Sequence, residues 1–416
     1  MIAELIAVGT EIVSGQALDT NSRRLAEELG RLGIRVKYHT SIGDDLEDNV
    51  DAFGTASRRV DLVVVTGGLG PTQDDLTRQV LANVAGVGLV HHEPSLEAIR
   101  ALFARRNRVM TDRNRVQALF PEGAEPLPNR IGTAPGIWMR IARAWFAALP
   151  GVPYEMEAMF AEQVAPRLRA EGLATRVIVH RKINLFGKGE AEVESLALDL
   201  TARGRKPEVG ITVSDATISF RVAGEGADEA EALASISETL DTIRSRFADI
   251  YVGEGDVDIA DAAAASLIAQ GKTLATAESC TGGMIASRLT SIPGISAAYL
   301  GGLVTYSNDA KSRLVDVPAE LIETRGAVSP ETAAAMAEGV RDRFGADYGL
   351  AVTGIAGPGG GTPEKPVGLV YIGLAGPRGT STSNLELGPE QPRDVIQRRT
   401  TKHALNRLRL ELAAGS

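Results

Sequence analysis

The sequence predicts an α/β protein of three domains, in which two larger α/β domains flank a small α+β connector. Strand and helix patterns alternate over residues 2–90 and again over residues 258–412, and the 416-residue chain is too long for one ordinary domain. Its hydrophobic fraction of 44% is that of a globular protein, so each domain has enough apolar residues to bury a core. We place the domains at residues 1–172, 173–253 and 254–416.

The first domain opens with the pattern of a doubly wound parallel sheet. Strands are expected where apolar residues run without interruption, and helices where they recur with helical spacing. The expected order is strand, helix, strand, helix, strand, over Ile2–Val8, Asp19–Leu32, Arg35–Ser41, Leu46–Ser57 and Asp61–Thr66. Beyond Val90 we expect an arginine-rich helical stretch over residues 94–130, then two short strands and a helix that ends near Glu171.

The middle segment, residues 175–252, reads as strand, helix, two strands, a long helix and a short strand. The long helix is expected over Glu225–Phe247. This order also occurs in RNA-binding KH-like folds, but the segment carries no GxxG loop with basic neighbours. We therefore interpret it as a KH-like connector without an RNA-binding role.

Composition narrows the class of protein. The formal net charge of −9 and the pI of about 5.3 argue against a broad nucleic-acid footprint. Cys280 is the single cysteine, which fits a reducing compartment. No apolar run approaches the roughly 18 residues needed to span a bilayer, and the start lacks a signal-peptide pattern. We expect a cytoplasmic protein that binds neither membrane nor nucleic acid.

A first chemical motif is TAESCTGG, residues 276–283, between an expected strand and a helix over Met284–Leu289. The turn places Ser279 and Cys280 at a helix N-terminus, where free N–H groups stabilise negative charge and suit an oxyanion hole. Gly282 and Gly283 permit the sharp turn. The alternative is that Ser279 or Thr281 only caps the helix.

A second motif is VTYSNDAK, residues 304–311, in which a strand ends at Tyr306 and Asn308 caps a helix that holds Lys311. Burial and the helix dipole would lower the pKa of Lys311, so that its neutral amine can serve as a base for a serine. Tyr306 can orient either group. The alternative for Lys311 is a solvated surface lysine.

A third motif is VTGIAGPGGG, residues 352–361, in which a strand over Tyr348–Thr353 leads into a glycine-rich loop. Such loops bring backbone N–H groups close to a phosphate or a carboxylate. Ligands of open α/β sheets bind at the carboxyl ends of the strands, so these three strand-end motifs predict one site.

The first domain carries its own glycine-rich loop, TGGLGPTQDDLT, residues 66–77, after a buried strand. Its glycines permit backbone contact with an anion, and its two aspartates can hold Mg²⁺ bridging to a diphosphate. GTEIVSG (residues 9–15) and IGDD (residues 42–45) end neighbouring strands and converge on the same crevice. The predicted nucleotide-binding residues are Glu11, Asp44, Gly67, Gly68, Gly70 and Thr72, and the predicted metal ligands are Asp74 and Asp75. Helix capping by either aspartate is the alternative.

Together with GAVSPET (residues 326–332) and KPVG (residues 365–368), the three C-terminal motifs resemble the CinA C-terminal family. The resemblance implies a nicotinamide-nucleotide amidase, which hydrolyses nicotinamide mononucleotide to nicotinic acid mononucleotide and ammonia without a cofactor. It implies Ser279 as nucleophile and Lys311 as base, with Tyr306 and Thr353 as supporting catalytic residues. The implied substrate-binding residues are Cys280, Thr281, Gly282, Gly283, Gly354, Arg393 and Arg398.

The phosphate-binding arginine of that family follows Gly-Asp, whereas this chain has Gln391-Pro392-Arg393. Arg393 is our first choice for the substrate phosphate and Arg398 the second. Cys280 is a rival nucleophile beside Ser279, since a thiolate at a helix N-terminus is chemically reasonable; the family motif favours serine.

The N-terminal loop resembles the molybdopterin-binding fold of the MoaB and MogA proteins, with Asp44 and Asp75 at that fold's two aspartates. GTAPG (residues 132–136) and LPGVPYEM (residues 149–156) extend the resemblance to the CinA family over the whole chain. It implies a metal-dependent ADP-ribose pyrophosphatase, giving AMP and ribose 5-phosphate, and a homodimer. The alternatives are a pterin-binding module and a non-enzymatic partner in competence or DNA repair.

Overall fold

The structure is a computed structural model that describes residues 1–414. The chain divides into two compact units, residues 1–180 with 223–237 and residues 181–222 with 238–416. Within the described residues, no helix is both long and apolar enough to cross a bilayer.

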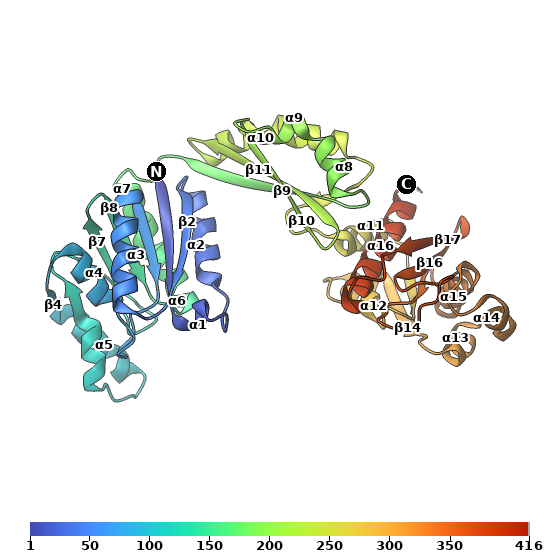
Figure 1. The fold of residues 1–416 in the computed structure, drawn as a ribbon, viewed down its shortest axis with the longest axis horizontal. Coiled ribbons are helices and arrows are strands. Elements are labelled where there is room, and N and C mark those ends of the chain that lie inside the picture. Colours follow the sequence, from blue (N-terminus) through green and yellow to red (C-terminus); the bar gives the residue numbers. More distant parts are fainter. Residues whose placement is uncertain (415–416) are drawn as a thin grey trace. The chain divides into compact units, whose positions relative to one another are not determined.

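The N-terminal fold is a six-stranded sheet in the order β2-β1-β3-β8-β7-β6 (Figure 1). Its strands are β1 (Ile2–Val8), β2 (Arg35–Ile42), β3 (Leu62–Thr66), β6 (Glu125–Leu127), β7 (Gly136–Ile141) and β8 (Ala144–Leu149). β2, β1, β3 and β8 run parallel, whereas β7 is antiparallel to both of its neighbours, β8 and β6. The expected sheet is therefore confirmed in class and at its core, but it is mixed and not purely parallel.

Helices cover both faces of this sheet, as the doubly wound pattern predicts. Leu5 and Val64 face a core that includes Leu25 of α2, and the next residues, Ile6 and Val65, face the opposite core. This alternation follows from the two-residue period of a strand. The helices are α1 (Thr10–Val13), α2 (Thr20–Arg31), α3 (Leu46–Arg59), α4 (Thr77–Ala85), α5 (Glu93–Arg105), α6 (Pro153–Met159) and α7 (Ala165–Ala170).

The arginine-rich stretch is less helical than expected. α5 ends at Arg105, a 3-10 turn covers Asp112–Ala118, and the short strands β4 (Leu89–His91) and β5 (Leu119–Pro121) pair with each other. Two buried side chains of the 3-10 turn, Asn114 and Gln117, bond within the turn and to Thr133, so tertiary contacts decide this segment.

The middle domain is a four-stranded sheet in the order β10-β11-β9-β12. Its element order follows the prediction, except that two short helices stand where one was expected. Its elements are β9 (Val177–Leu185), α8 (Glu190–Ser195), α9 (Leu198–Thr201), β10 (Glu208–Ser214), β11 (Thr217–Gly226), α10 (Glu229–Arg246) and β12 (Tyr251–Glu254). The tight β10–β11 turn places Asp215 and Ala216 at φ of 50° and 63°.

The C-terminal fold is a five-stranded sheet in the order β14-β13-β15-β16-β17, of which the first three strands are parallel. Its strands are β13 (Leu274–Glu278), β14 (Tyr299–Val304), β15 (Tyr348–Gly354), β16 (Leu369–Gly376) and β17 (Gly379–Glu386). Its helices are α11 (Ile259–Ala269), α12 (Met284–Thr290), α13 (Asn308–Val315), α14 (Ala319–Arg325), α15 (Pro330–Phe344) and α16 (Arg393–Ala414).

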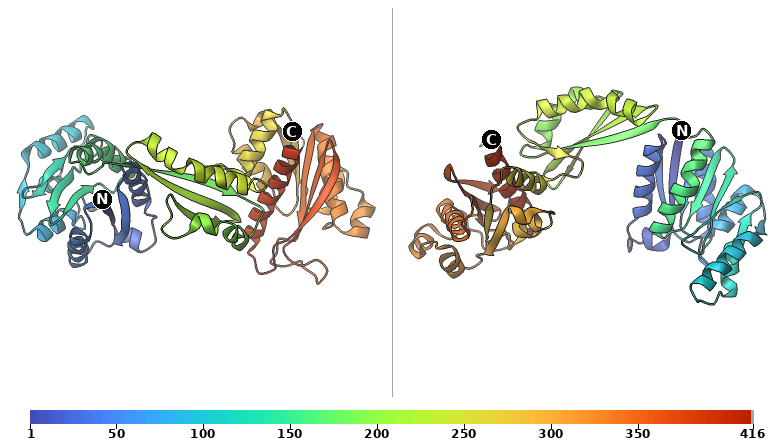
Figure 2. Two further views of the ribbon diagram at one scale, coloured as in Figure 1. Left: turned by 90° about the horizontal axis from the view of Figure 1, so that it is seen from above. Right: turned by 180° about the vertical axis from the view of Figure 1, so that it is seen from behind.

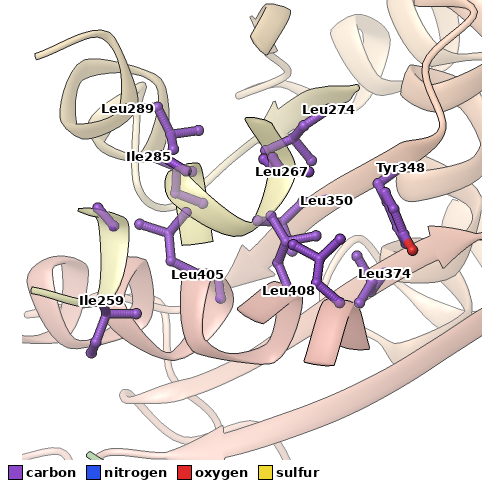
Figure 3. Close-up of a cluster of buried hydrophobic side chains, with 14 of the residues drawn as sticks. Ile259, Leu267, Leu274, Ile285, Leu289, Tyr348, Leu350, Leu374, Leu405 and Leu408 are labelled. Atoms are coloured by element: carbon purple, nitrogen blue, oxygen red, sulfur yellow. The ribbon is translucent and has the colours of Figure 1, made fainter. Parts of the chain in front are cut away.

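Helices cover both faces of this sheet (Figure 2), and an apolar core lies on each face. Leu267, Ile285 and Leu405 bring α11, α12 and α16 against one face, as Figure 3 shows. Met336 of α15 and Val315 of α13 pack against the other. The sheet register puts Glu278 of β13 level with Val304 of β14 and Val352 of β15. The loops that follow these three strands therefore start at one edge.

Candidate active site

Ser279 lies on the tight turn that follows β13. Its backbone N–H donates to the carbonyl of Val352 (3.0 Å), which ties the turn to β15, and its side chain is nearly buried. Gly282 and Gly283 have φ of 62° and 101°, a conformation that side chains disfavour. The N-cap residue of α12 is Gly283, and neither the Ser279 nor the Thr281 hydroxyl accepts from a helix N–H, so the alternative role of either residue as a helix cap is wrong.

Lys311 points into the protein and meets Ser279. Its Nζ lies 3.1 Å from Oγ of Ser279 and donates to the carbonyls of Thr305 (2.9 Å) and Tyr306 (3.3 Å). Only 2% of Lys311 is exposed, so the alternative of a surface lysine is wrong. α13 is capped by Ser307, whose Oγ accepts from the N–H of Ala310, and not by Asn308 as expected.

Burial lowers the pKa of Lys311 below 10.5 because the charged amine is cut off from water. Within residues 1–414, no carboxylate forms an ion pair with it. The neighbouring polar groups are carbonyl oxygens and a hydroxyl, which can hold a neutral amine. Lys311 thus has the surroundings of a base.

Glu278 takes the helix N-terminus that was expected to stay free for an anion. Its buried carboxylate accepts from the N–H groups of Gly283 (3.0 Å), Ile285 (3.0 Å) and Ala286 (2.8 Å). The expectation of an oxyanion hole made by these helix N–H groups is therefore wrong. Glu278 could have been found from the sequence, because an acidic residue is rare within a buried apolar strand and needs a partner when it occurs there.

Cys280 is buried beside Ser279, with Ala356, Val370 and Ile396 around it. Desolvation raises the pKa of its thiol to about 12, and the negative charge of Glu278 adds to the shift. A thiol in such surroundings stays protonated at neutral pH. This argues against Cys280 as the nucleophile.

Tyr306 and Arg393 meet above the end of the sheet. Arg393, the first residue of α16, donates through Nη2 to Oη of Tyr306 (3.1 Å) and through Nη1 to the carbonyl of Gly357 (2.6 Å). Tyr306 is 62% exposed, so this pair faces solvent. Arg398 instead bonds to Asp394 (2.5 Å) and lies 3.7 Å from Asp215.

Three more predicted site residues do not hydrogen-bond to the Ser279–Lys311 pair through their side chains. They are Thr353, Thr281 and Gly354. Oγ1 of Thr353 donates to the carbonyl of Ala327 (2.7 Å) and not to Ser279 or Lys311. Thr281 is 1% exposed, and within the described residues its hydroxyl has no hydrogen-bond partner. A Cβ on Gly354 would stand 2.6 Å from Val370, so this glycine permits β15 and β16 to approach.

Two supporting residues were missed by the sequence reasoning. Lys365 ties the glycine-rich loop to its neighbour, since its Nζ donates to the carbonyls of Arg325 (2.9 Å) and Val328 (2.8 Å). Gln397 of α16 donates to the carbonyl of Cys280 (2.7 Å). All three bonds go to backbone carbonyls far away in sequence, and no local pattern marks such partners.

The N-terminal loop is built around Asp75. Its carboxylate accepts from the N–H groups of Gly70 (2.7 Å) and Thr72 (2.8 Å) and from the Thr72 hydroxyl. α4 begins only at Thr77 and has no side-chain cap, so the capping alternative is wrong here too. Arg78, which was missed, is buried beneath the loop and donates to the carbonyls of Leu69 and Gly70.

The neighbouring strand ends converge on this loop as predicted. Asp44 accepts from the N–H (2.8 Å) and the hydroxyl (2.7 Å) of Thr10, so the loops after β1 and β2 are joined. A Cβ on Gly67 would stand 2.2 Å from the carbonyl of Val8, and its φ is 101°, so only glycine fits. Gly68 faces Thr77 just as closely, and Glu11 lies beside Gly9 on the first of these loops.

Of the two predicted metal ligands, Asp74 is the accessible one. It is exposed, whereas the carboxylate of Asp75 is engaged within the loop. Among residues 1–414, no group of three or more His, Cys, Asp or Glu side chains surrounds a metal position. Mg²⁺ commonly takes one or two protein carboxylates and completes its shell with water and substrate phosphate, so an exposed Asp74 beside the glycine-rich loop fits it.

Three domain families match the chain, and together they cover nearly all of it. The family described as "Probable molybdopterin binding domain" matches residues 4–170, "Damage-inducible protein CinA KH domain" matches residues 180–253, and "CinA C-terminal domain" matches residues 256–412.

Whole proteins match as well. The CinA-like protein of Gloeobacter violaceus is 43% identical over 414 residues, 99% of this chain and 96% of the relative. The CinA-like protein of Dictyoglomus thermophilum is 41% identical over 98% of both chains. The crystal structure of competence/damage inducible protein CihA from Agrobacterium tumefaciens covers 38% of this chain and 96% of its own, at 43% identity and a TM-score of 0.36. With its three domains and near full-length relatives, the chain belongs to the CinA family.

Proposed function

We propose that the C-terminal domain is a nicotinamide-nucleotide amidase that hydrolyses nicotinamide mononucleotide to nicotinic acid mononucleotide and ammonia. The observation that carries the proposal is the buried lysine, which has no counter-ion among residues 1–414 and lies 3.1 Å from a serine hydroxyl on a strand-end turn. Serine–lysine pairs perform acyl transfer in unrelated folds, so this geometry supports amide hydrolysis.

The neutral amine of Lys311 has two N–H groups and one lone pair. Since both N–H groups can donate to the carbonyls of Thr305 and Tyr306, the lone pair faces Oγ of Ser279. Lys311 takes the hydroxyl proton as Oγ attacks the amide carbon, and returns it to the leaving nitrogen, which departs as ammonia. Water then attacks the acyl-serine ester and gives a proton to Lys311. As the ester C–O bond breaks, Lys311 returns that proton to Oγ of Ser279, and the released acid ionises to the carboxylate product.

The developing oxyanion needs donors other than the helix N–H groups that Glu278 occupies. We assign this role to the backbone N–H groups of Cys280 and Thr281, which lie on the turn beside Ser279. The bonds of Glu278 to α12 and of Gln397 to the Cys280 carbonyl hold that turn in place.

Arg393 is the residue we assign to the substrate phosphate. Its guanidinium reaches Tyr306 at the solvent-facing rim of the site, whereas Arg398 is engaged by Asp394 and Asp215. Arginine suits this role because its planar fork binds phosphate oxygens in pairs. Tyr306 contacts both Lys311 and Arg393, since its carbonyl accepts from Lys311 and its exposed hydroxyl accepts from Arg393, and its ring can contact the ribose or the nicotinamide.

The test is ammonia release from nicotinamide mononucleotide by the full chain, with Ser279→Ala as the matched variant. We expect ammonia from the wild type and a loss of roughly 10⁴-fold or more in the variant. Equal release by both proteins would reject Ser279 as nucleophile. Release by neither would reject the amidase, and would favour a scaffold role for this domain.

We propose further that the N-terminal domain is a metal-dependent ADP-ribose pyrophosphatase that yields AMP and ribose 5-phosphate. The observation that favours it is the ordered glycine loop, with Asp75 engaged inside the loop and Asp74 left exposed beside it. A divalent cation such as Mg²⁺, held by Asp74 and the substrate diphosphate, would neutralise charge on the phosphates. The loop N–H groups that Asp75 does not take, and the turn at Gly67 and Gly68, would orient the diphosphate.

This second proposal is tested by AMP release from ADP-ribose with and without Mg²⁺. We expect Asp74→Asn to lose Mg²⁺-dependent turnover while the melting temperature stays unchanged, because the side chain is exposed. Tight binding of a pterin without AMP release would favour the pterin-binding alternative. A salt-sensitive shift of DNA would favour the non-enzymatic one.

A further inference from the structure

The last helix, α16, reaches the active-site loops with its first turns. Arg393 bonds to Tyr306 and to the carbonyl of Gly357, and Gln397 bonds to the carbonyl of Cys280. Because these three bonds all leave one helix, the placement of α16 along its axis decides where Arg393 meets a substrate.

The β10–β11 hairpin of the middle domain contacts the same helix. Nζ of Lys402 donates to the carbonyl of Asp215 (2.7 Å) and to Oγ1 of Thr217 (3.2 Å), and it lies 3.2 Å from the Asp215 carboxylate. Arg398 lies 3.7 Å from the same carboxylate. The side chains of Lys402 and Asp215 are only 24% and 26% exposed, so solvent screens this pair less than a surface pair.

Further contacts, one of them between aromatic rings, join α16 to the middle domain. The Phe186 ring meets the His403 ring edge-on at 4.8 Å, and Phe186 belongs to the same buried cluster as Leu405 and Leu408 of α16. Arg409 donates to the carbonyl of Tyr251 in β12 (2.7 Å). α16 is therefore packed between the C-terminal sheet and the middle domain.

We propose that the middle domain is a positioning element of the amidase site, and that Asp215 and Lys402 are its positioning residues. Lys402 follows Arg393 by nine positions, or about 13 Å of helix, and a packed helix moves as one body over that length. The inference rests on the proposed amidase function, and it makes a narrow claim. The contact between Lys402 and Asp215, here called the clamp, acts through Arg393. Loss of the clamp should therefore weaken turnover of the phosphate-bearing substrate and leave turnover of the corresponding nucleoside unchanged.

The test compares wild type, Lys402→Met and Asp215→Asn on nicotinamide mononucleotide and on nicotinamide riboside. Asn is chosen at position 215 because it tolerates the positive φ of 50° found there. We expect each variant to raise the KM for the mononucleotide about fivefold with less than a twofold change in kcat. The kcat/KM for the riboside should stay constant, and the effect should vanish in an Arg393→Ala background. Asp199→Ala, which breaks an exposed ion pair with Arg246 in the same domain, is the control and should change nothing.

Equal losses on both substrates, or the same loss in the Arg393→Ala background, would overturn the proposal in favour of a purely structural contact. If the wild type releases no ammonia, the proposed amidase function is rejected. The clamp is then tested separately by amide hydrogen exchange. The amides of residues 393–400 should then exchange at least about threefold faster in Lys402→Met than in wild type. Unchanged exchange would reject the clamp itself.

Discussion

At the scale of single residues, the site depends on how burial changes the acidity of two neighbouring groups. Burial lowers the pKa of Lys311 and raises that of Cys280 to about 12. Desolvation favours the neutral form in both cases, which frees the lone pair of the amine but leaves the thiol protonated. One environment thus favours Lys311 as base and disfavours Cys280 as nucleophile.

The lowered pKa of Lys311 predicts the pH dependence of the amidase. kcat/KM should rise as Lys311 loses its proton and reach a plateau below pH 10.5, the ordinary value for lysine. Lys311→Met should lower kcat by roughly 10²–10⁴-fold and abolish that ionisation in the profile. If the pH profile of Lys311→Met kept the same rise in kcat/KM, the ionisation would belong to another group.

The same shift predicts how stability depends on pH. Between the lowered pKa and 10.5, the unfolded chain holds more protons on Lys311 than the folded protein, so this residue makes the free energy of unfolding rise with pH. Urea unfolding of wild type and Lys311→Met at several pH values measures it. The free energy of unfolding of wild type minus that of Lys311→Met should rise with pH over this range, and a difference independent of pH would contradict the assignment.

Cys280 provides a separate prediction about the nucleophile. Cys280→Ser should keep most amidase activity, because the thiol is buried and protonated, and Ser279→Ala should lose it. Steady-state kinetics of ammonia release on both variants decides the matter. An inactive Cys280→Ser beside an active Ser279→Ala would reverse the assignment.

At the scale of elements, the turn between β13 and α12 depends on one buried carboxylate. Glu278 closes the helix start with three backbone hydrogen bonds, a role that capping residues usually perform from just outside a helix. Charge-assisted bonds of this kind are shorter and stronger than neutral ones. The element that presents Ser279 is therefore held by the residue that precedes it.

Glu278→Gln tests that role. The amide oxygen of Gln cannot accept from all three N–H groups that the carboxylate binds. We therefore expect the free energy of unfolding of the C-terminal domain to fall by about 1.5–3 kcal/mol, and kcat to fall as well. Glu320→Gln, an exposed acid in the first turn of α14, is the matched control and should change neither. Urea unfolding gives the stability, and the ammonia assay gives the rate. A variant with wild-type stability would show that water replaces the carboxylate.

At the scale of the whole molecule, the two candidate sites lie in different compact units, each with its own sheet and cores. In both folds the candidate residues follow parallel strands at their carboxyl ends, the usual ligand position in open α/β sheets. The middle domain connects the two and also holds α16 through Asp215 and Lys402.

This arrangement predicts two activities that fail independently. Ser279→Ala should abolish ammonia release and leave Mg²⁺-dependent AMP release unchanged, and Asp74→Asn should do the reverse. Both assays on both variants, with wild type alongside, complete the test. Loss of both activities in either variant would indicate that the sites are coupled.

The sequence by itself determined the fold class, the order of strands and helices, and the turns that carry Ser279 and Lys311. These features follow from apolar periodicity and from glycines in the left-handed region, which are local properties of the chain. The helical expectation for residues 94–130 failed because buried Asn114 and Gln117 find their partners in a 3-10 turn and in a distant loop.

Only the tertiary structure decided what the polar groups do. It placed Lys311 3.1 Å from Ser279, gave the helix N–H groups to Glu278, engaged Asp75 within its own loop, and joined α16 to the middle domain. A hydrogen bond depends on atoms within about 3 Å, whatever their separation in sequence, and burial depends on everything packed around a group. Neither quantity is contained in a local pattern, so the chemistry of these side chains was fixed only when the sheets and helices came together.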